Sequence, residues 1–380
     1  MITIIVAGIV LVAAVYFGKK YTTSKKVAEN TEYYNQFSDE AYIEFAKKLE
    51  QSIHTKKPDF FDESVNLASF FSFSQKELEG SLNKRRILNA AKPILKFGKN
   101  ISSSILFEKD FKFVRFYKEN GVPHIIFRIY SPQFINFVDF TVGIKKDTLV
   151  LNDAYNFISG INFSDIISDI YYKSINSNSA SLSNVKTYRK IQSGIEVGTY
   201  EEAYNLLTSI PEKNRDALHY QFLLIAASNL DDDKFLEVIA QLKAQKPDDK
   251  RLHAYLDFRK NVITGDIDQL NTAIDALKEY VGEDPVFDLF RGLMYYYQGD
   301  SETSSSFFNH LIANVPDFYD AYLYKLCNYI LDDKTTEALE IVVQIKDRFS
   351  IDEKAFTEEL FEFKAFTSSE AFKNIFKSAE

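Results

Sequence analysis

The chain has 380 residues and a mass of 43.8 kDa, long enough for two or three cores, since single domains usually run to about 100–200 residues. Hydrophobic residues make up 46% of it and charged residues 26%, which excludes wholesale disorder. Residues 1–120 hold 19 basic and 14 acidic side chains, a net of +5, so the total of −9 leaves −14 for 121–380. Because nucleic acids require clustered Lys and Arg, we expect no nucleic-acid partner.

The first feature along the chain is an uncharged run from Ile2 to Phe17, which ends at Lys19 and Lys20. A helix of this length spans about 24 Å, slightly less than a bilayer core of about 30 Å. The basic residues follow the run instead of preceding it, so it predicts an uncleaved transmembrane anchor over residues 1–18. The positive-inside rule then predicts a single-pass cell-membrane protein with a cytoplasmic body. A periplasmic or extracellular body is the alternative.

Helical signals begin after a polar stretch at 19–37, which we interpret as a linker. Ser38 can cap a helix, and the acidic residues behind it favour the helix dipole. Apolar side chains then recur at spacings of three and four, which predicts one buried face. They are Tyr42, Phe45, Leu49 and Ile53. Two more helices are expected at 60–71 and 75–97.

After Ser104 the pattern changes to short aromatic and β-branched runs separated by turn residues, such as those at 119–121 and 145–147. This pattern predicts four antiparallel strands. The runs cover 111–117, 123–130, 134–144 and 148–157. A closing helix is expected at 162–172, with Ser164 at its N-cap.

This order of elements, ending in NFVDFTVGIKKDTLVLNDAYNFISGINFSDIISDIYY, resembles the nuclear-transport-factor-2-like (NTF2-like) or cystatin-like superfamily, as found in bacterial proteins. The resemblance implies an α+β domain over 38–173 in which helices and a curved antiparallel sheet enclose a pocket. Some members use that pocket for catalysis, and many use the domain for binding or dimerisation. A homodimer through this domain is therefore possible.

Strand alternation places polar side chains within the apolar runs of this sheet. If their faces converge, an imidazole, a guanidinium and carboxylates meet in a partly apolar cone, where a general base or an anion clamp is built. An internal salt-bridged network or a solvent-facing sheet explains the alternation equally well. The candidate pocket residues are His124, Arg128, Tyr130, Asp139, Asp153 and Tyr155.

From about residue 184 onward, amphipathic helices of about 12–15 residues follow one another, which calls for a repeat search. Pro285 to Phe318 carries a small residue, an aromatic, a turn, a second aromatic and a proline at tetratricopeptide-repeat (TPR) consensus positions. These are Gly292, Tyr295, Gly299, Phe308 and Pro316. The region is similar to this family over 184–380, with about five hairpins and a final helical cap from residue 353, although the family's first-helix tryptophan is absent.

A hairpin of about 34 residues cannot bury both of its faces alone, so neighbours stack into a superhelical solenoid with a groove along the first helices. Tyr and Arg in that groove suit a protein-binding surface. The alternative is that the aromatic spacing fills the inter-helix core. By the family's register, the groove residues expected to bind a partner are Tyr255, Arg259, Leu289, Leu293, Tyr296 and Tyr297.

Signatures of catalysis are missing from the sequence: there is no Gly-rich phosphate loop, no HExxH and no Gly-x-Ser-x-Gly elbow. The lone Cys327 excludes an internal disulfide and a multi-cysteine zinc site. We expect no catalytic residues, no metal and no cofactor. The predicted function is a membrane-anchored, non-enzymatic scaffold or adaptor that binds a protein through its repeats. The alternative is a small-ligand-binding protein or enzyme that uses the NTF2-like pocket.

Overall fold

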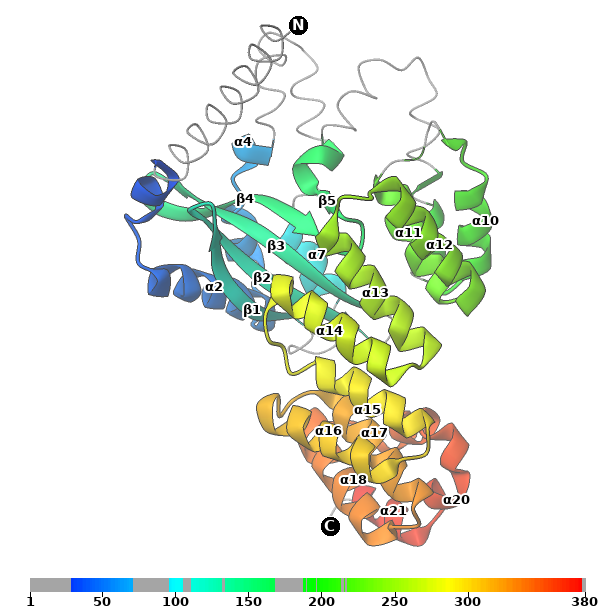
Figure 1. Ribbon diagram of the computed structural model, residues 1–380. Coiled ribbons are helices and arrows are strands. Elements are labelled where there is room, and N and C mark those ends of the chain that lie inside the picture. Colours follow the sequence, from blue (N-terminus) through cyan, green and yellow to red (C-terminus); the bar gives the residue numbers. More distant parts are fainter. Residues whose placement is uncertain are drawn as a thin grey trace, which may run out of the picture.

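The computed structural model shows an α+β part followed along the chain by an all-helical part (Figure 1). It describes residues 29–70, 96–104, 111–131, 134–167 and 187–377, except 189, 196, 213–214 and 216. Across these residues we find no helix that is both long and apolar enough to cross a bilayer. The anchor predicted over 1–18, the linker up to residue 28 and most of the helix predicted over 75–97 lie outside them.

One layer of the α+β part consists of helices. α2 (Asp39–His54) begins as predicted at Ser38, whose side chain accepts a hydrogen bond from the Ala41 amide, and its apolar stripe is buried. The helix predicted over 60–71 is instead two short helices, α3 (Asp59–Glu63) and α4 (Leu67–Phe70), and α7 (Phe97–Ser104) completes the layer. The break has a tertiary cause. Between α3 and α4, Ser64 and Asn66 exchange backbone hydrogen bonds with Leu151, which a continuous helix would forbid.

The second layer is an antiparallel sheet with the strand order β1-β2-β3-β4-β5. Its strands are β1 (Phe111–Glu119), β2 (Val122–Ser131), β3 (Phe134–Lys145), β4 (Thr148–Asn156) and β5 (Ile161–Asn162). The sheet therefore has one strand more than the four predicted, because the two-residue β5 turns back onto the end of β4. Asn120 and Gly121 both adopt positive φ, as a two-residue hairpin between right-twisted strands requires.

The helical part is a series of antiparallel hairpins. After helical residues 187–188 and 190–195 come α10 (Tyr200–Thr208), α11 (Ala217–Ser228), α12 (Asp232–Gln245), α13 (Lys250–Thr264), α14 (Ile267–Val281), α15 (Phe287–Tyr297), α16 (Ser301–Asn314), α17 (Tyr319–Leu331) and α18 (Thr335–Phe349). The chain closes with α19 (Glu353–Glu359), η4 (Phe361–Phe363), α20 (Lys364–Thr367) and α21 (Glu370–Phe376). The repeat pattern predicts a small residue at position 292. The structure agrees, because a Cβ atom on Gly292 would lie only 2.5 Å from the Phe308 ring.

Both faces of the sheet are covered, each by a different part of the chain. Ile125, Phe127 and Phe140 point into a phenylalanine-rich core beneath α2, α3 and α7. On the opposite face, Ile126 and Phe137 share one core with the helical hairpins. Figure 1 shows α13 and α14 lying across this second face. The sheet is therefore the middle layer between its own helices and the repeat region.

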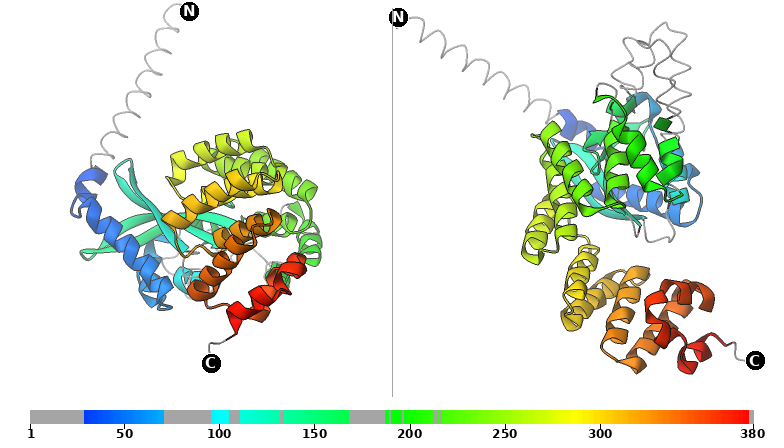
Figure 2. Two further views of the ribbon diagram at one scale, coloured as in Figure 1. Left: turned by 90° about the horizontal axis from the view of Figure 1, so that it is seen from below. Right: turned by 90° about the vertical axis from the view of Figure 1, so that its right-hand side faces the viewer.

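The C-terminal helices from α15 to α21, which we call the arm, extend beyond the sheet (Figure 2). The base of the arm contacts the sheet: Phe287 lies 6.0 Å from Phe137, and Phe318 lies 4.8 Å from Tyr130, between ring centroids. Tyr319, Leu326 and Phe356 belong to a separate core within the arm. The arm is thus anchored at one end and packed independently beyond it.

A buried ion pair joins the sheet to the base of the arm. The guanidinium of Arg128 on β2 donates to the carboxylate of Asp284, and their side chains are 0% and 2% exposed. Asp284 also accepts from the Val286 amide at 3.0 Å, just before α15, and the guanidinium lies 5.7 Å from the Phe318 ring centroid. Removing one charge would leave the other buried without its partner, which is far costlier than removing both.

We therefore expect Arg128→Ala or Asp284→Ala to lower the free energy of unfolding by about 3–5 kcal/mol, and the double variant Arg128→Met/Asp284→Leu to recover most of that loss. Urea unfolding followed by circular dichroism measures both changes. The control is Glu202→Gln, which breaks the exposed pair with Lys190 and should change stability by less than about 1 kcal/mol. A single variant at Arg128 or Asp284 as mild as this control would refute the coupling.

Candidate functional site

The predicted pocket residues do not line the space between the sheet and its own helices. In the described residues that space is filled by stacked rings, such as Phe111 on Phe127 at 4.7 Å, within the core that also holds Phe61 and Phe140. Arg128, Tyr130 and Tyr155 lie on the opposite face and contact the repeat region. The expected cone is therefore replaced by a contact between the two parts of the chain.

Three acidic residues of successive hairpins receive these side chains. Asp249, Asp284 and Asp320 lie near the N-terminal ends of α13, α15 and α17, about one repeat apart. The Tyr155 hydroxyl donates to Asp249 at 2.9 Å, Arg128 donates to Asp284, and the Tyr130 hydroxyl donates to Asp320. Sequence reasoning missed this row of carboxylates. The sequence does contain a pattern that could have predicted it: an acidic residue recurs just before or within the first turn of each of these hairpins.

Asp153, one of the six predicted pocket residues, lies apart from the others. Its carboxylate accepts from the hydroxyl of Ser164 at 2.5 Å and from the Ser164 amide at 3.1 Å, where the helical residues 163–167 begin. Burial raises the pKa of Asp153, although the bonds from Ser164 and Ala154 oppose that rise. Asp153 thus caps this helical turn from a neighbouring strand and does not join the other predicted residues.

Asp139 and His124 do come together, in a polar cluster beside a cleft. Buried Asp139 accepts from His124 Nδ1 at 3.0 Å, the Tyr117 hydroxyl at 2.5 Å and Arg251 at 3.5 Å. Burial, and then the Asp139 carboxylate, raises the pKa of Tyr117. The Arg251 guanidinium lies 3.7 Å from the centroid of the Tyr155 ring. Asp139 thus fixes side chains from β1, β2 and α13.

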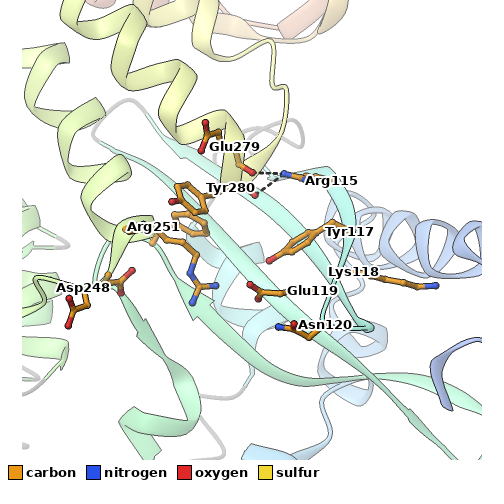
Figure 3. Close-up of a pocket in the computed structure, with 12 residues that line it drawn as sticks. Arg115, Tyr117, Lys118, Glu119, Asn120, Asp248, Arg251, Glu279 and Tyr280 are labelled. Carbon is orange, nitrogen blue, oxygen red and sulfur yellow. Dashed lines mark hydrogen bonds between the residues drawn. The ribbon is translucent and has the colours of Figure 1, made fainter. Parts of the chain in front are cut away.

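The cleft lies between the β1–β2 hairpin and the helices α13 and α14, and has a volume of about 750 Å³ (Figure 3). Arg115 crosses one end and donates to the backbone carbonyls of Glu279 and Tyr280 at 2.9 and 3.3 Å, where the α14 dipole favours a cation. Its charged lining residues are balanced in sign: Arg115, Lys118, Lys250 and Arg251 against Glu119, Asp248, Asp249 and Glu279. Mixed charge of this kind selects neither an anion nor a cation.

The described residues contain no group of three or more His, Cys, Asp or Glu arranged to hold a metal. Cys327 is buried in the arm, where burial, followed by the carboxylates Glu359 and Glu362, raises its pKa to about 12. A thiol with so high a pKa is a poor nucleophile, because the thiolate is the reactive form. Cys327 therefore acts as a small apolar packing residue.

The groove residues predicted from the repeat register fall into two groups. Tyr255 is fully buried and donates to the Ile135 carbonyl of β3 at 2.6 Å. Arg259 is buried behind it and donates to the Tyr255 hydroxyl at 3.4 Å, and Leu289 is buried in the same core. Leu293 and Tyr296 are only partly buried. The sheet thus covers the groove along α13, whereas along the arm Leu293 and Tyr296 pack partly buried against the two hydrophobic cores.

Along the arm, apolar side chains are exposed at matching positions of two hairpins. Tyr297 on α15 is 72% exposed, and Leu331, one repeat later on α17, is 57% exposed. Partly buried Leu293, Tyr296 and Leu323 lie on the same first helices. We call these five residues the arm face. Leu331 was missed by sequence reasoning, although the register that located Tyr297 also assigns it.

No family model and no curated protein matches this chain. Among solved structures, the chain is similar to the crystal structure of PilW, described as a widely conserved type IV pilus biogenesis factor. The TM-score is 0.36 at 15% sequence identity, and the superposition covers 52% of this chain and 99% of the PilW chain. A likeness at this level carries no inference about fold or function.

The contact between Tyr130 and Asp320 has a pH signature. Burial raises the pKa of Asp320 above 3.8, while the Tyr130 hydroxyl bond opposes the rise. The unfolded state therefore releases this proton at lower pH than the folded state, so the contribution of Asp320 to stability falls as pH rises through its folded pKa. If Asp320 is replaced by asparagine, the amide oxygen can still accept the hydrogen bond from Tyr130. An amide does not titrate, so this pH-dependent loss of stability no longer occurs.

We expect Asp320→Asn to gain stability relative to the unmodified chain as pH rises from about 4 to about 7. Asp320→Ala, which removes the acceptor, should cost about 1–3 kcal/mol. Urea unfolding curves of the three proteins at several pH values measure this. A difference between Asp320→Asn and the unmodified chain that does not vary with pH would contradict the raised pKa.

Proposed function

We propose that this chain is a membrane-tethered, non-enzymatic scaffold that binds a segment of another protein on the arm face. One observation carries the proposal. Tyr255 is covered by the sheet, whereas Tyr297 and Leu331 are exposed at groove positions of the arm. The chain therefore covers the first part of its own groove with the sheet and leaves Tyr297 and Leu331 exposed in the second part.

The chemistry of the arm face supports a protein partner. Aromatic residues are enriched in the energetically dominant parts of protein interfaces, where they contribute large contact areas. The Tyr296 and Tyr297 rings contact each other edge to face at 5.4 Å, and Tyr296 also lies 5.7 Å from the Tyr324 ring. Burial raises the pKa of Tyr296 to about 12, so its hydroxyl remains a hydrogen-bond donor at neutral pH. A ligand on this face meets a partly fixed aromatic surface.

In this proposal the NTF2-like domain supports the hairpins. Arg128, Tyr130 and Tyr155 hold three successive hairpins at fixed positions on the sheet. Both sheet faces are covered within the chain, so a homodimer through a sheet face is not part of the proposal.

The proposed anchor over 1–18 would place the body at the membrane on its cytoplasmic side. The described N-terminal residues and the C-terminal helices lie at opposite ends of the molecule (Figures 1 and 2). A chain tethered at its N-terminus can therefore extend its arm away from the bilayer. This geometry suits the recruitment of a soluble partner to the membrane.

The arm face can be tested with point variants of the full chain. We expect Tyr297→Ser/Leu331→Ser to reduce recovery of the partner by at least about fivefold, because truncating central apolar interface residues commonly costs more than 1 kcal/mol each. The readout is quantitative mass spectrometry after affinity purification from detergent-solubilised membranes. Val343→Ser on α18 is the control, since Val343 is also exposed but lies on the second helix of its hairpin.

Thermal unfolding of the same variants separates binding from stability. A fall in melting temperature without loss of the partner would identify Tyr297 and Leu331 as packing residues and refute the proposal. Point variants are preferred to a chain that ends before α10, because such a truncation uncovers the apolar sheet face that carries Ile126 and Phe137.

The tether is tested by deleting residues 1–18. The deleted chain should move from the membrane fraction to the soluble fraction, because the apolar run supplies the free energy of insertion. Immunoblotting of fractions washed with carbonate measures the shift, with the unmodified chain as control. A deleted chain that stays in the washed membrane pellet would disprove the anchor.

A further inference from the structure

We infer that the cleft between the β1–β2 hairpin and the helices α13 and α14 binds a short zwitterionic peptide. The terminal carboxylate of the peptide pairs with the guanidinium of Arg251, and its terminal ammonium pairs with the carboxylate of Glu119. None of the residues that line this cleft belongs to the arm face, so the inference does not depend on the function proposed above.

Arg251 is held in position, but few of its donors are used. Its guanidinium lies 3.7 Å from the centroid of the Tyr155 ring, and the Tyr155 hydroxyl donates to the Asp249 carboxylate at 2.9 Å. Among the described residues, the polar partner of the guanidinium is Asp139 at 3.5 Å, the outer limit of a hydrogen bond. A guanidinium has five N–H donors, and the Arg251 side chain is 32% exposed. A planar fork positioned in this way suits a carboxylate.

Asp139 orients Arg251 without taking the place of a ligand. Its carboxylate is buried, accepts from the Tyr117 hydroxyl at 2.5 Å and lies 3.0 Å from His124 Nδ1. Three side chains therefore share its two oxygens, and the contact with Arg251 is the longest of the three. A carboxylate that enters the cleft from solvent can form shorter bonds with the guanidinium than Asp139 does.

Glu119 lines the same cleft from the other wall. Figure 3 shows Arg251 entering the cleft from α13 and Glu119 entering it from the β1–β2 hairpin. The two side chains form no ion pair with each other. Neighbouring cations have other partners, since Lys118 pairs with Asp39 at 2.7 Å and Arg115 donates to backbone carbonyls of α14. Opposite charges that line one cleft without pairing leave space for a ligand that contacts both.

The balance of charge and the size of the cleft favour the same class of ligand. Because four basic and four acidic side chains line it, an anion or a cation alone meets as many like charges as opposite ones. A zwitterion supplies one charge of each sign. The volume of about 750 Å³ exceeds what a single amino acid fills, and the rings of Tyr117, Phe157 and Tyr280 suit apolar side chains. These properties fit a peptide of two or three residues.

Tripeptides of the series Ala-Xaa-Ala, with aromatic, aliphatic, polar or charged central residues, test the inference on the detergent-solubilised full chain. At about 1 mM, at least one of them should raise the melting temperature by at least about 2 °C, because a ligand of the folded state stabilises it. Isothermal titration calorimetry then compares that peptide with its C-terminal amide and its N-acetyl form. Amidation should weaken binding at least about tenfold, and acetylation, which removes the pair with exposed Glu119, at least about threefold.

Point variants assign the two charges of the peptide to their partners. Arg251→Gln should remove most of the difference between the free and the amidated peptide, and Glu119→Gln most of the difference between the free and the acetylated peptide. The matched control is Lys260→Gln, which removes a positive charge from the other end of α13 and should leave both differences unchanged.

Three results would overturn the inference: no tripeptide raises the melting temperature, the three forms of the peptide bind equally, or the differences persist in the variants. The comparison of the three forms uses the unmodified chain, so it holds even where a variant is destabilised. All three results leave the proposal for the arm face intact, because that proposal is tested by recovery of a protein partner in Tyr297→Ser/Leu331→Ser.

Discussion

The arrangement of this protein depends on the buried pairing of Arg128 with Asp284. A guanidinium and a carboxylate without solvent contact are expensive to bury, and only close mutual contact with further hydrogen bonds offsets that cost. The pair therefore favours one docking position of the sheet on the hairpins over any shifted position, because a shift would separate the charges. Tyr130 and Tyr155 add hydroxyl bonds to Asp320 and Asp249 on either side, so three successive hairpins align with the strands.

This docking decides which part of the groove is available. Tyr255 would face a ligand in an isolated repeat array, but here its hydroxyl donates to the Ile135 carbonyl. The sheet acts toward α13 as a bound partner would, with a continuous apolar core and hydrogen bonds at its rim. Along the arm the cover is partial, because Tyr296 and Leu323 pack against a core that includes the C-terminal cap, whereas Tyr297 and Leu331 are exposed. The fold thus separates a structural contact from an open surface within one groove.

Local patterns in the sequence predicted the elements well, since periods of two and of about 3.6 residues depend on nearby residues. Ser38 as a cap and Gly292 against Phe308 are examples of such local chemistry. The sequence could not predict which part of the chain covers each face of the sheet. Arg128 and Tyr130 alternate with apolar residues in a way that suits a pocket, a solvent face or a domain contact, and their partners lie 156 and 190 residues away. A contact with a distant residue also explains why the helix predicted over 60–71 is two helices: Leu151 forms backbone hydrogen bonds with the chain between α3 and α4.

The fixed base of the arm also affects how its open face can bind. Association loses free energy when flexible groups must be ordered, so a surface held in place before contact binds with a smaller loss. The base is held by Asp284 and Phe318 on the sheet, and the outer hairpin is closed by Phe356 and Phe372 of the C-terminal cap, which pack on α17 and α18. With both ends packed, the exposed Tyr297 and Leu331 lie on helices whose positions are already determined. A segment that bound there would therefore need to order fewer groups of this protein on binding.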